Sequence, residues 1–506
     1  MAAPLRLTCL SLLPGLLAAQ SPASVRQAVS SITAADVIRR IGILADDSML
    51  GRATPSPQLD KVAAYVAGEF QRFGLKPGGD NGSYQQRYPL TSVAIVPESS
   101  YVRLTGDVRA EWKLGRDASY YRGQARAGES SAEMVVVSGT PTDRPVDPTK
   151  LNGKVLLYLG FGGGTLQQVI GKAQPAAILF ATTLPEEEWQ ERTARQSRPA
   201  IQLAAPEAAS PPIFFIRLDR VLAALSGTGI TVDTSAGTRN GSLRIRPVPG
   251  VLVHFALRQL VSTGLSAPNV IGILEGSDPR LKREYVFFTG HMDHLGTPGS
   301  GEGCAARGTD SICNGADDDA SGTTAVIEAA EAFVRLSPRS KRSLVFMTVS
   351  GEERGLWGSS YYANHPTVPL ANVVADLNTD MVGRNWKDTI AVIGKEHSDL
   401  GATLNRVGAA HPELHMQPID DIWPQEGFYF RSDHYNFARK GVPILFFFNG
   451  THPDYHQVSD EVAKIDAEKE ARIIQLVFYL GLEIANAAKR PQWNPDSFRR
   501  IVQGQN

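Results

Sequence analysis

The chain has 506 residues with a formal net charge of −1, and 42% of its residues are hydrophobic. This is an ordinary globular composition, long enough for two or three domains with sizeable cores. No run of Lys or Arg is long enough to form a nucleic-acid-binding arm, so the sequence argues against nucleic acid as a partner.

Residues 1–21 are typical of a secretory signal. Arg6 supplies the positive charge, the apolar stretch LTCLSLLPGLLAA follows, and AQS at 19–21 offers small residues for cleavage. The apolar stretch is too short to span a bilayer, and no later stretch reaches the roughly 18 apolar residues that a membrane helix needs. We therefore expect a mature protein without a transmembrane segment, secreted or periplasmic. A disordered apolar N-terminus is the alternative.

Two cysteines, Cys304 and Cys313, would remain after this cleavage. An even pair in an oxidising compartment favours one disulfide that closes a short loop. Free thiols or incidental buried cysteines are the alternative.

Two amphipathic helical stretches open the mature chain, AADVIRRIGILAD (34–46) and SPQLDKVAAYVAGEFQRFG (56–74), the second ending at the stop residue Gly74. The texture changes over residues 96–250, where short apolar strands such as EMVVVSG and PPIFFIRL are separated by turns. This pattern predicts a β-rich insert with its own core, which divides a larger domain into residues 22–95 and 251–506.

Strands and helices alternate through the second part of that larger domain. The strands are nearly continuous apolar runs: EYVFFTG (284–290), SLVFMTVSG (343–351), VVADLNT (373–379) and VPILFFFNG (442–450). Such runs are typical of a sheet covered by helices on both faces. We predict an α/β fold with a mixed, mainly parallel sheet between helices. In such sheets, ligands bind beyond the carboxyl ends of the strands.

Carboxylates and imidazoles follow each of these strands. In chain order they are His291, Asp293 and His294, then Glu352 and Glu353, then Asp380, and last His452, Asp454, His456 and Asp460. Like charges gathered at one sheet edge repel and raise each other's pKa, and metal cations relieve this repulsion. Histidines with carboxylates suit zinc, and more than four candidate ligands indicate two metals.

The stretch NGADDDASG (314–322) adds three adjacent aspartates just before an apolar helical run. They could cap the helix, hold calcium or hold a catalytic metal. From Asp317 the spacing nearly fits an EF-hand loop, but the preceding segment is rich in Gly and turn residues instead of helical. The TTAVIEAAEAF stretch also predicts helix too early for a calcium loop.

Signatures of other hydrolases, HExxH and GxSxG, are missing from the sequence. The chain instead resembles the secreted co-catalytic dizinc aminopeptidases, a family that includes glutamate carboxypeptidases and glutaminyl cyclases. The motifs that carry the resemblance are GHMDHLG (290–296), NGADDDASG, SGEERGLWGS (350–359), NTDMVG (378–383), RSDH (431–434) and YHQVSDE (455–461). Residues 96–250 resemble the protease-associated domain that is often inserted in this family.

The resemblance implies two Zn²⁺ ions per chain. His291, Asp380 and one oxygen of Asp318 would hold one zinc, and Glu353, His456 and the other oxygen of Asp318 would hold the second. It also implies a cis bond between Asp318 and Asp319. His294, His434 and His452 are expected not to be ligands.

The same resemblance implies the catalytic groups. Glu352 would be the general base for a zinc-bridged water, and Tyr455 would donate a hydrogen bond to the oxyanion. Asp293 and Asp460 would orient the histidine ligands. Asp319 would brace the turn and the helix start, and Asp317 would add little beyond negative potential. A solvated charge and a structural phenol are the alternatives for Glu352 and Tyr455.

We therefore expect a zinc-dependent aminopeptidase that hydrolyses the N-terminal bond of peptides. Trp423 and Phe428 would wall an apolar specificity pocket, although packing alone would also explain them. Arg431 would meet a substrate carboxylate if the enzyme is instead a carboxypeptidase or dipeptidase. A glutaminyl cyclase and a non-enzymatic, receptor-like ectodomain are weaker alternatives. The preferred side chain, the oligomeric state and the role of the insert stay open.

Overall fold

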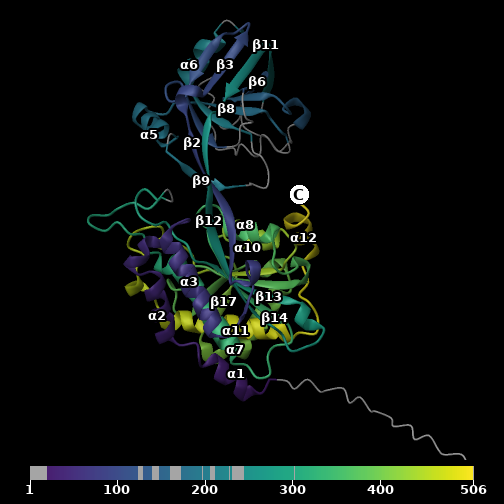
Figure 1. The fold of residues 1–506 in the computed structure, drawn as a ribbon. Helices are drawn as coiled ribbons and strands as arrows, with labels where there is room; N and C mark the ends of the chain where they lie inside the picture. Colours follow the sequence, from purple (N-terminus) through teal and green to yellow (C-terminus); the bar gives the residue numbers. More distant parts are fainter. Residues whose placement is uncertain are drawn as a thin grey trace, which may run out of the picture. The chain divides into compact units, whose positions relative to one another are not determined.

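Figure 1 shows a computed structural model that describes residues 20–504, except 123–128, 139–146, 160–172, 197, 205–210, 227, 231–243 and 301–302. The chain divides into two compact units, one made of Met1–Tyr88 with Ser266–Asn506 and the other of Pro89–Leu265. Residues 1–19, which hold most of the predicted secretory signal, lie outside the described part. Within the described residues, none of the helices combines the length and apolar character needed to cross a membrane.

A mixed sheet forms the centre of the larger unit. Its strands run in the order β17-β16-β18-β15-β13-β14-β12. They are β12 (Gln259–Leu274), β13 (Tyr285–His291), β14 (Ser343–Val349), β15 (Val373–Thr379), β16 (Thr389–Ile393), β17 (Gln417–Ile419) and β18 (Ile444–Phe447), and the short β1 (Lys76–Pro77) pairs with β12. The four central strands β14, β13, β15 and β18 are mutually parallel. All four coincide with the predicted apolar runs, so the mixed, mainly parallel sheet is confirmed.

Helices cover both faces of this sheet, as predicted. The described helices of this unit are α1 (Pro22–Val29), α2 (Ala34–Leu44), α3 (Pro57–Arg72), α7 (Gly322–Val334), α8 (Trp357–Asn364), α9 (Leu400–Ala410), α10 (His434–Ala438), α11 (Ala467–Asn486) and α12 (Pro495–Ile501). Successive side chains of β13 point to opposite faces. Phe287 packs against Tyr362 of α8 and Phe437 of α10, whereas Phe288 packs against Phe333 of α7.

Local sequence fixes the ends of the helices. Ser56 accepts a hydrogen bond from the amide of Leu59 at 3.0 Å and so caps α3, whose first residue is Pro57. Gly74 has a φ of +75° just after the helix, where the left-handed conformation favours glycine. The predicted stop at Gly74 is therefore confirmed.

The smaller unit is β-rich, as expected of the insert. Its eight-stranded sheet has the order β4-β3-β11-β6-β7-β8-β10-β5. The strands are β3 (Tyr101–Gly106), β4 (Ala110–Lys113), β5 (Ala118–Arg122), β6 (Glu129–Ser138), β7 (Val155–Tyr158), β8 (Ala177–Thr182), β10 (Ile213–Arg217) and β11 (Arg244–Ala256). Strands β2 (Gln85–Ile95) and β9 (Ala200–Leu203) lie outside this eight-stranded sheet and pair antiparallel with each other, and the helices in the described residues are α5 (Glu186–Gln196) and α6 (Leu218–Leu225).

The bounds of the smaller unit differ from the predicted insert. The unit spans Pro89–Leu265, so it begins before residue 96 and ends after residue 250. The physical reason is that the ends of the unit, residues 89 and 265, fall inside the regular strands β2 and β12, where the sequence pattern does not change. The expected boundary at residue 96 instead follows the end of β2, and the one at residue 250 lies within β11.

Candidate metal centre

The four parallel strands of the larger unit bring the polar side chains that follow them to one edge of the sheet. His291 is the last residue of β13, and Asp380 directly follows β15. Glu352 and Glu353 come shortly after β14, and His456 comes after β18. Because parallel strands present their carboxyl ends at the same edge, residues far apart in the sequence meet here.

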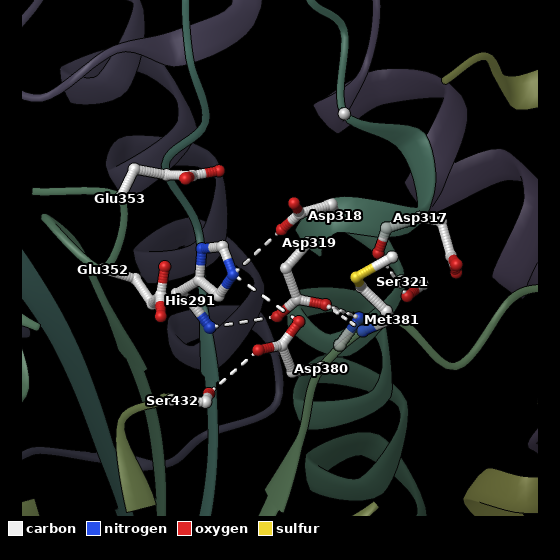
Figure 2. Close-up of polar contacts among 12 residues, drawn as sticks. His291, Asp317, Asp318, Asp319, Ser321, Glu352, Glu353, Asp380, Met381 and Ser432 are labelled. Carbon is white, nitrogen blue, oxygen red and sulfur yellow. Dashed lines mark hydrogen bonds and ion pairs between the residues drawn. The ribbon is translucent and has the colours of Figure 1, made fainter. Parts of the chain in front are cut away.

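One group of possible ligands surrounds His291 (Figure 2). Its Nε2 atom lies 3.2 Å from Oδ1 of Asp318 and 3.7 Å from Oδ1 of Asp380. Ligand atoms on one tetrahedral zinc lie about 3.3–3.5 Å apart, because Zn–N and Zn–O distances are about 2.0–2.2 Å. The spacing of this group therefore fits a single zinc.

A second group shares Asp318 with the first. Nε2 of His456 lies 3.3 Å from Oδ2 of Asp318 and 3.3 Å from Oε2 of Glu353. Asp318 thus turns one oxygen toward each group. All five ligands that the resemblance implies are brought together, with Asp318 between the two sets.

His294, which was expected not to be a ligand, also lies in the second group. Its Nδ1 is 2.7 Å from Oε1 of Glu353 and 3.9 Å from Oδ2 of Asp318. Both ring nitrogens of His294 and Oε1 of Glu353 are buried, and none has a hydrogen-bond partner in suitable geometry within the described part of the chain. Buried polar atoms without partners are costly, and a cation shared between them would remove that cost.

The electrostatics of the cluster also fit a cation. Burial, together with the neighbouring charge of Asp318, raises the pKa of the Asp380 carboxyl. Burial likewise raises the pKa of Glu352 well above its ordinary value, with the nearby Glu353 adding to the effect. Carboxylates held this close in a dry site repel each other, so a divalent cation is what would allow them to ionise together. Imidazoles with carboxylates are a donor set suited to zinc.

The three aspartates of NGADDDASG have three different environments. Asp318 faces His291, whereas the Asp317 carboxylate points away from the cluster (Figure 2). Asp319 accepts hydrogen bonds from the amides of His291 at 3.1 Å and Gly322 at 2.7 Å, so it braces the start of α7 as expected. The Asp318–Asp319 bond is cis. Helix α7 already begins at Gly322, which excludes the EF-hand alternative.

Asp317 does more than the expected addition of negative potential. Its Oδ1 accepts a 2.6 Å hydrogen bond from the amide of Gly383, and its Oδ2 lies 3.2 Å from Nε2 of His452. The side chain is fully buried. Asp317 therefore ties the aspartate turn to two other loops of the site, and His452 pairs with it there.

The two aspartates expected to orient the histidine ligands differ in their contacts. Nδ1 of His291 lies 3.2 Å from the backbone carbonyl oxygen of Asp293 and 3.6 Å from its Oδ1, so Asp293 lies beside that ring nitrogen. Asp460 requires a correction, because it was expected to orient His456. Its carboxylate instead accepts hydrogen bonds from the amides of Asp317 and Asp318 at 3.0 and 3.1 Å. It therefore holds the backbone of the aspartate turn.

Arg52 is a positioning residue that the sequence analysis did not single out. Its guanidinium is fully buried and donates hydrogen bonds to the carbonyls of Met292 at 2.9 Å and Gly315 at 2.6 Å. It also bonds the carbonyl of Asn314. One arginine thus joins the loop after β13 to the aspartate turn. Arg52 ends the stretch LADDSMLGR (44–52), which begins at the end of the first predicted helical stretch.

A cavity opens onto the cluster. Glu352 and Tyr455 line it together with His291, Asp318 and Asp380. The Tyr455 ring stacks on the His456 ring with their centroids 3.8 Å apart. The two residues expected to be catalytic therefore share one cavity with the expected ligands of the first zinc.

The predicted specificity residues are only partly found at this cavity. Phe428 and Arg431 line it, and the Arg431 guanidinium lies 4.8 Å from the centre of the Phe428 ring. Trp423 is not among the described residues that line it, which corrects the prediction, because Trp423 packs behind Phe428 and Phe448.

Other apolar residues replace Trp423 in the wall of the cavity. They are Met381, Phe446 and Phe448. Phe446 and Phe448 were part of an apolar run that predicted a buried strand. Side chains two residues apart along a strand point to the same face, so the sequence itself predicts that Phe446 and Phe448 share one side.

Cys304 and Cys313 are joined by a disulfide. The pair packs in a small apolar cluster with Leu295 and Val458. These two residues belong to the GHMDHLG and YHQVSDE motifs, so the disulfide loop lies against the two loops that carry the histidines.

Comparison with known proteins agrees with this arrangement. Residues 269–481 match the family described as peptidase family M28. A "Probable zinc metalloprotease" of Pyricularia oryzae is 34% identical over 179 residues, which cover 34% of this chain and 33% of the relative. Aminopeptidase YwaD of Bacillus subtilis is 25% identical over 238 residues, 46% of this chain and 47% of the relative. The chain thus spans less than half the length of these two curated relatives.

A solved structure supports the fold. The aminopeptidase from Aneurinibacillus sp. strain AM-1 superposes with a TM-score of 0.51 at 18% sequence identity, covering 92% of this chain and 97% of that chain. Residues 269–481, which contain the strand-end cluster, thus match peptidase family M28.

Proposed function

We propose that this protein is a dizinc aminopeptidase that removes N-terminal residues from peptides. The observation that carries the proposal is the position of Asp318, which turns one oxygen to His291 and the other to His456. A carboxylate placed between two sets of ligands suits a pair of metal ions about 3.5–4 Å apart. The relatives named as a zinc metalloprotease and an aminopeptidase support the same activity.

We assign the ligands as the resemblance implies. His291, Asp380 and Asp318 would hold one zinc, and Glu353, His456 and Asp318 would hold the other. Bound zinc would supply a Lewis acid for the scissile carbonyl and lower the pKa of water in the site. Ser432 donates a 2.8 Å hydrogen bond to Oδ2 of Asp380, which leaves Oδ1 directed toward His291.

Glu352 acts as the general base. It follows strand β14, directly before the proposed ligand Glu353, and it lines the cavity beside His291 and Asp318. Its amide donates a 3.3 Å hydrogen bond to Asp293, which fixes the backbone from which the carboxylate projects. Glu352 would take a proton from the attacking water and pass it to the leaving amine. Tyr455 donates a hydrogen bond to the oxygen on which negative charge develops.

The cavity wall favours an apolar side chain at the cleaved position. Met381, Phe428, Phe446 and Phe448 contribute apolar surface to it. The Phe428 and Phe448 rings also pack edge to face with their centroids 4.8 Å apart, so that part of the wall is held in place.

A carboxypeptidase or dipeptidase of the same family is the second candidate, and Arg431 is the observation in its favour. Arg431 lines the catalytic cavity, and its Nη1 lies 3.8 Å from Oε2 of Glu426. A guanidinium in that position can bind a substrate carboxylate bidentately.

One peptide panel separates the two candidates. Hydrolysis of Leu-Ala-Phe would be compared with that of its N-acetylated and C-terminally amidated forms. The aminopeptidase proposal expects cleavage of the free and amidated peptides, with loss of most activity on acetylation. Cleavage that needs the free carboxylate and tolerates acetylation would establish the second candidate in its place.

The ligand role of His456 has its own test, since His294 is close to the same carboxylates. His456 is equally spaced from Asp318 and Glu353, whereas His294 is not. We therefore expect His456→Gln to reduce bound zinc from two ions per chain to one, and His294→Gln to retain both. Zinc would be counted by plasma emission spectrometry after dialysis. Loss of zinc from the His294 variant alone would make His294 the ligand and His456 the residue that does not bind zinc.

The proposal includes action outside the cytoplasm. The signal-like pattern of residues 1–21 supports it, as does the Cys304–Cys313 disulfide, because structural disulfides persist in oxidising compartments.

A further inference from the structure

A second cavity lies within the smaller unit and shares no residue with the metal centre. Its volume is about 590 Å³, and it is bounded by β2, β5, β9 and α5, of which β2, β9 and α5 are labelled in Figure 1. Ligand sites typically enclose roughly 300–1,000 Å³ and combine an apolar wall with a few polar groups. The size of this cavity falls within that range.

One part of the cavity wall is apolar and aromatic. Val93 and Ile95 alternate inward along β2 and are almost fully buried. Tyr120 and Leu184 add to the same wall. The Tyr120 ring packs edge to face against Phe214 with their centroids 6.2 Å apart, so it is held by the core of the unit. A ligand that fills this space therefore presents an apolar or aromatic body.

One side of the cavity carries positive charge. Arg192, Arg195 and Arg198 line it together with Glu188 and Glu191, which leaves one net positive charge (three arginines against two glutamates). Arg195 is paired with Glu191 on the next turn of α5. The guanidinium of Arg192 is instead held by aromatic rings, 4.4 Å from the centre of Phe215 and 5.9 Å from that of Tyr121.

Two buried donors on this side have no acceptor. In the described structure, neither Nε of Arg192 nor Nε2 of Gln196 has a hydrogen-bond partner. The other end of the Gln196 amide is fixed, because its Oε1 accepts a 2.8 Å hydrogen bond from the amide of Tyr120. Buried donors are normally satisfied, and both residues line the cavity, so a ligand with acceptor oxygens there would supply partners that the described chain does not. A carboxylate can accept from both.

We propose that this cavity binds the C-terminal residue of a peptide, with its carboxylate at Arg192 and Gln196 and its apolar side chain against Val93, Ile95 and Tyr120. Other compounds also combine a carboxylate with an apolar group, and the choice of a peptide among them rests on the proposed function. The binding itself needs neither zinc nor turnover, so it can be tested separately.

The test measures binding to the full-length protein by isothermal titration calorimetry. The probe is N-acetyl-Ala-Ala-Phe, compared with the same peptide as its C-terminal amide. We expect the free acid to bind at least about tenfold more tightly than the amide, because only the acid supplies a charged acceptor. Equal binding of the two, or no binding, would overturn the proposal whatever the enzyme's activity.

Two variants locate the binding site. Arg192→Met keeps an apolar stem on the aromatic rings, and Gln196→Leu removes the second donor. Each is expected to abolish most of the preference for the acid. Arg103→Met is the matched control, because Arg103 lies 4.5 Å from the centre of the Tyr101 ring and pairs with Glu111 away from the cavity. If both variants still bound the free acid more tightly than the amide, the peptide would bind elsewhere and the proposal would be contradicted. Loss of that difference in Arg431→Met instead would have the same meaning.

Discussion

Replacing Glu352 with glutamine is expected to lower kcat by about 10²–10⁴-fold, the usual contribution of general acid–base catalysis. Glutamine has nearly the same shape but cannot accept a proton from water at neutral pH. Because Glu352 shares the cavity with His291 and Asp318 without being one of the assigned ligands, both zinc ions should stay bound. KM should change little.

Steady-state kinetics and zinc content together check this result. Glu413→Gln is the control, since Glu413 lies on the surface next to His411 and away from the cavity. It should have wild-type turnover. Near-normal kcat in Glu352→Gln would remove Glu352 from the proposed role, and loss of zinc from that variant would make it a ligand instead.

Asp318→Asn is expected to have the second large effect, this time on the metals. An asparagine side chain has one carbonyl oxygen and an amide nitrogen that does not bind zinc, so it cannot serve both groups of ligands. It also removes the negative charge that faces His291 and His456. We expect bound zinc to fall below one ion per chain. Activity should fall by more than the roughly 10–100-fold typical for loss of a residue that supports a ligand.

The neighbouring residue provides a matched control for that prediction. Asp317→Asn makes the same chemical change one position earlier, where the side chain binds the amide of Gly383 and points away from the cluster (Figure 2). This variant should retain two zinc ions, because an asparagine oxygen can still accept that hydrogen bond. If both variants lost zinc equally, the assignment of Asp318 alone as the shared ligand would be wrong.

The sheet could be predicted from the sequence because its strands are buried on both faces. The run VVADLNT corresponds to β15 residue for residue, and EYVFFTG is displaced from β13 by one residue. Continuous apolar runs of this length between helical segments have few alternatives. The convergence of His291, Glu353 and Asp380 then follows from parallel pairing alone.

The directions of neighbouring side chains at the site could not be predicted in the same way. Asp317, Asp318 and Asp319 are chemically identical and adjacent, and only the irregular turn before α7 sends them to three different sets of partners. Trp423 and Phe448 are both aromatic and near the site, but only Phe448 lines the cavity. Such differences depend on backbone angles and packing that composition and periodicity do not contain.

Long-range polar contacts escaped prediction for a related reason. Arg52 is 240 residues before Met292, whose carbonyl it binds, and no local pattern links an arginine in an N-terminal turn to that loop. His452 and Asp317 are likewise 135 residues apart. The ends of the insert were misplaced because β2 and β12 continue through the boundary as regular strands.

The zinc content of the purified wild-type protein tests the central claim most directly. Metal would be counted per chain after dialysis, and hydrolysis of a peptide with a free amine would be followed before and after chelation. Two zinc ions per chain, loss of hydrolysis on chelation and its recovery on adding zinc are the predicted results. A protein that binds no zinc, or that hydrolyses the peptide equally well after chelation, would contradict the account.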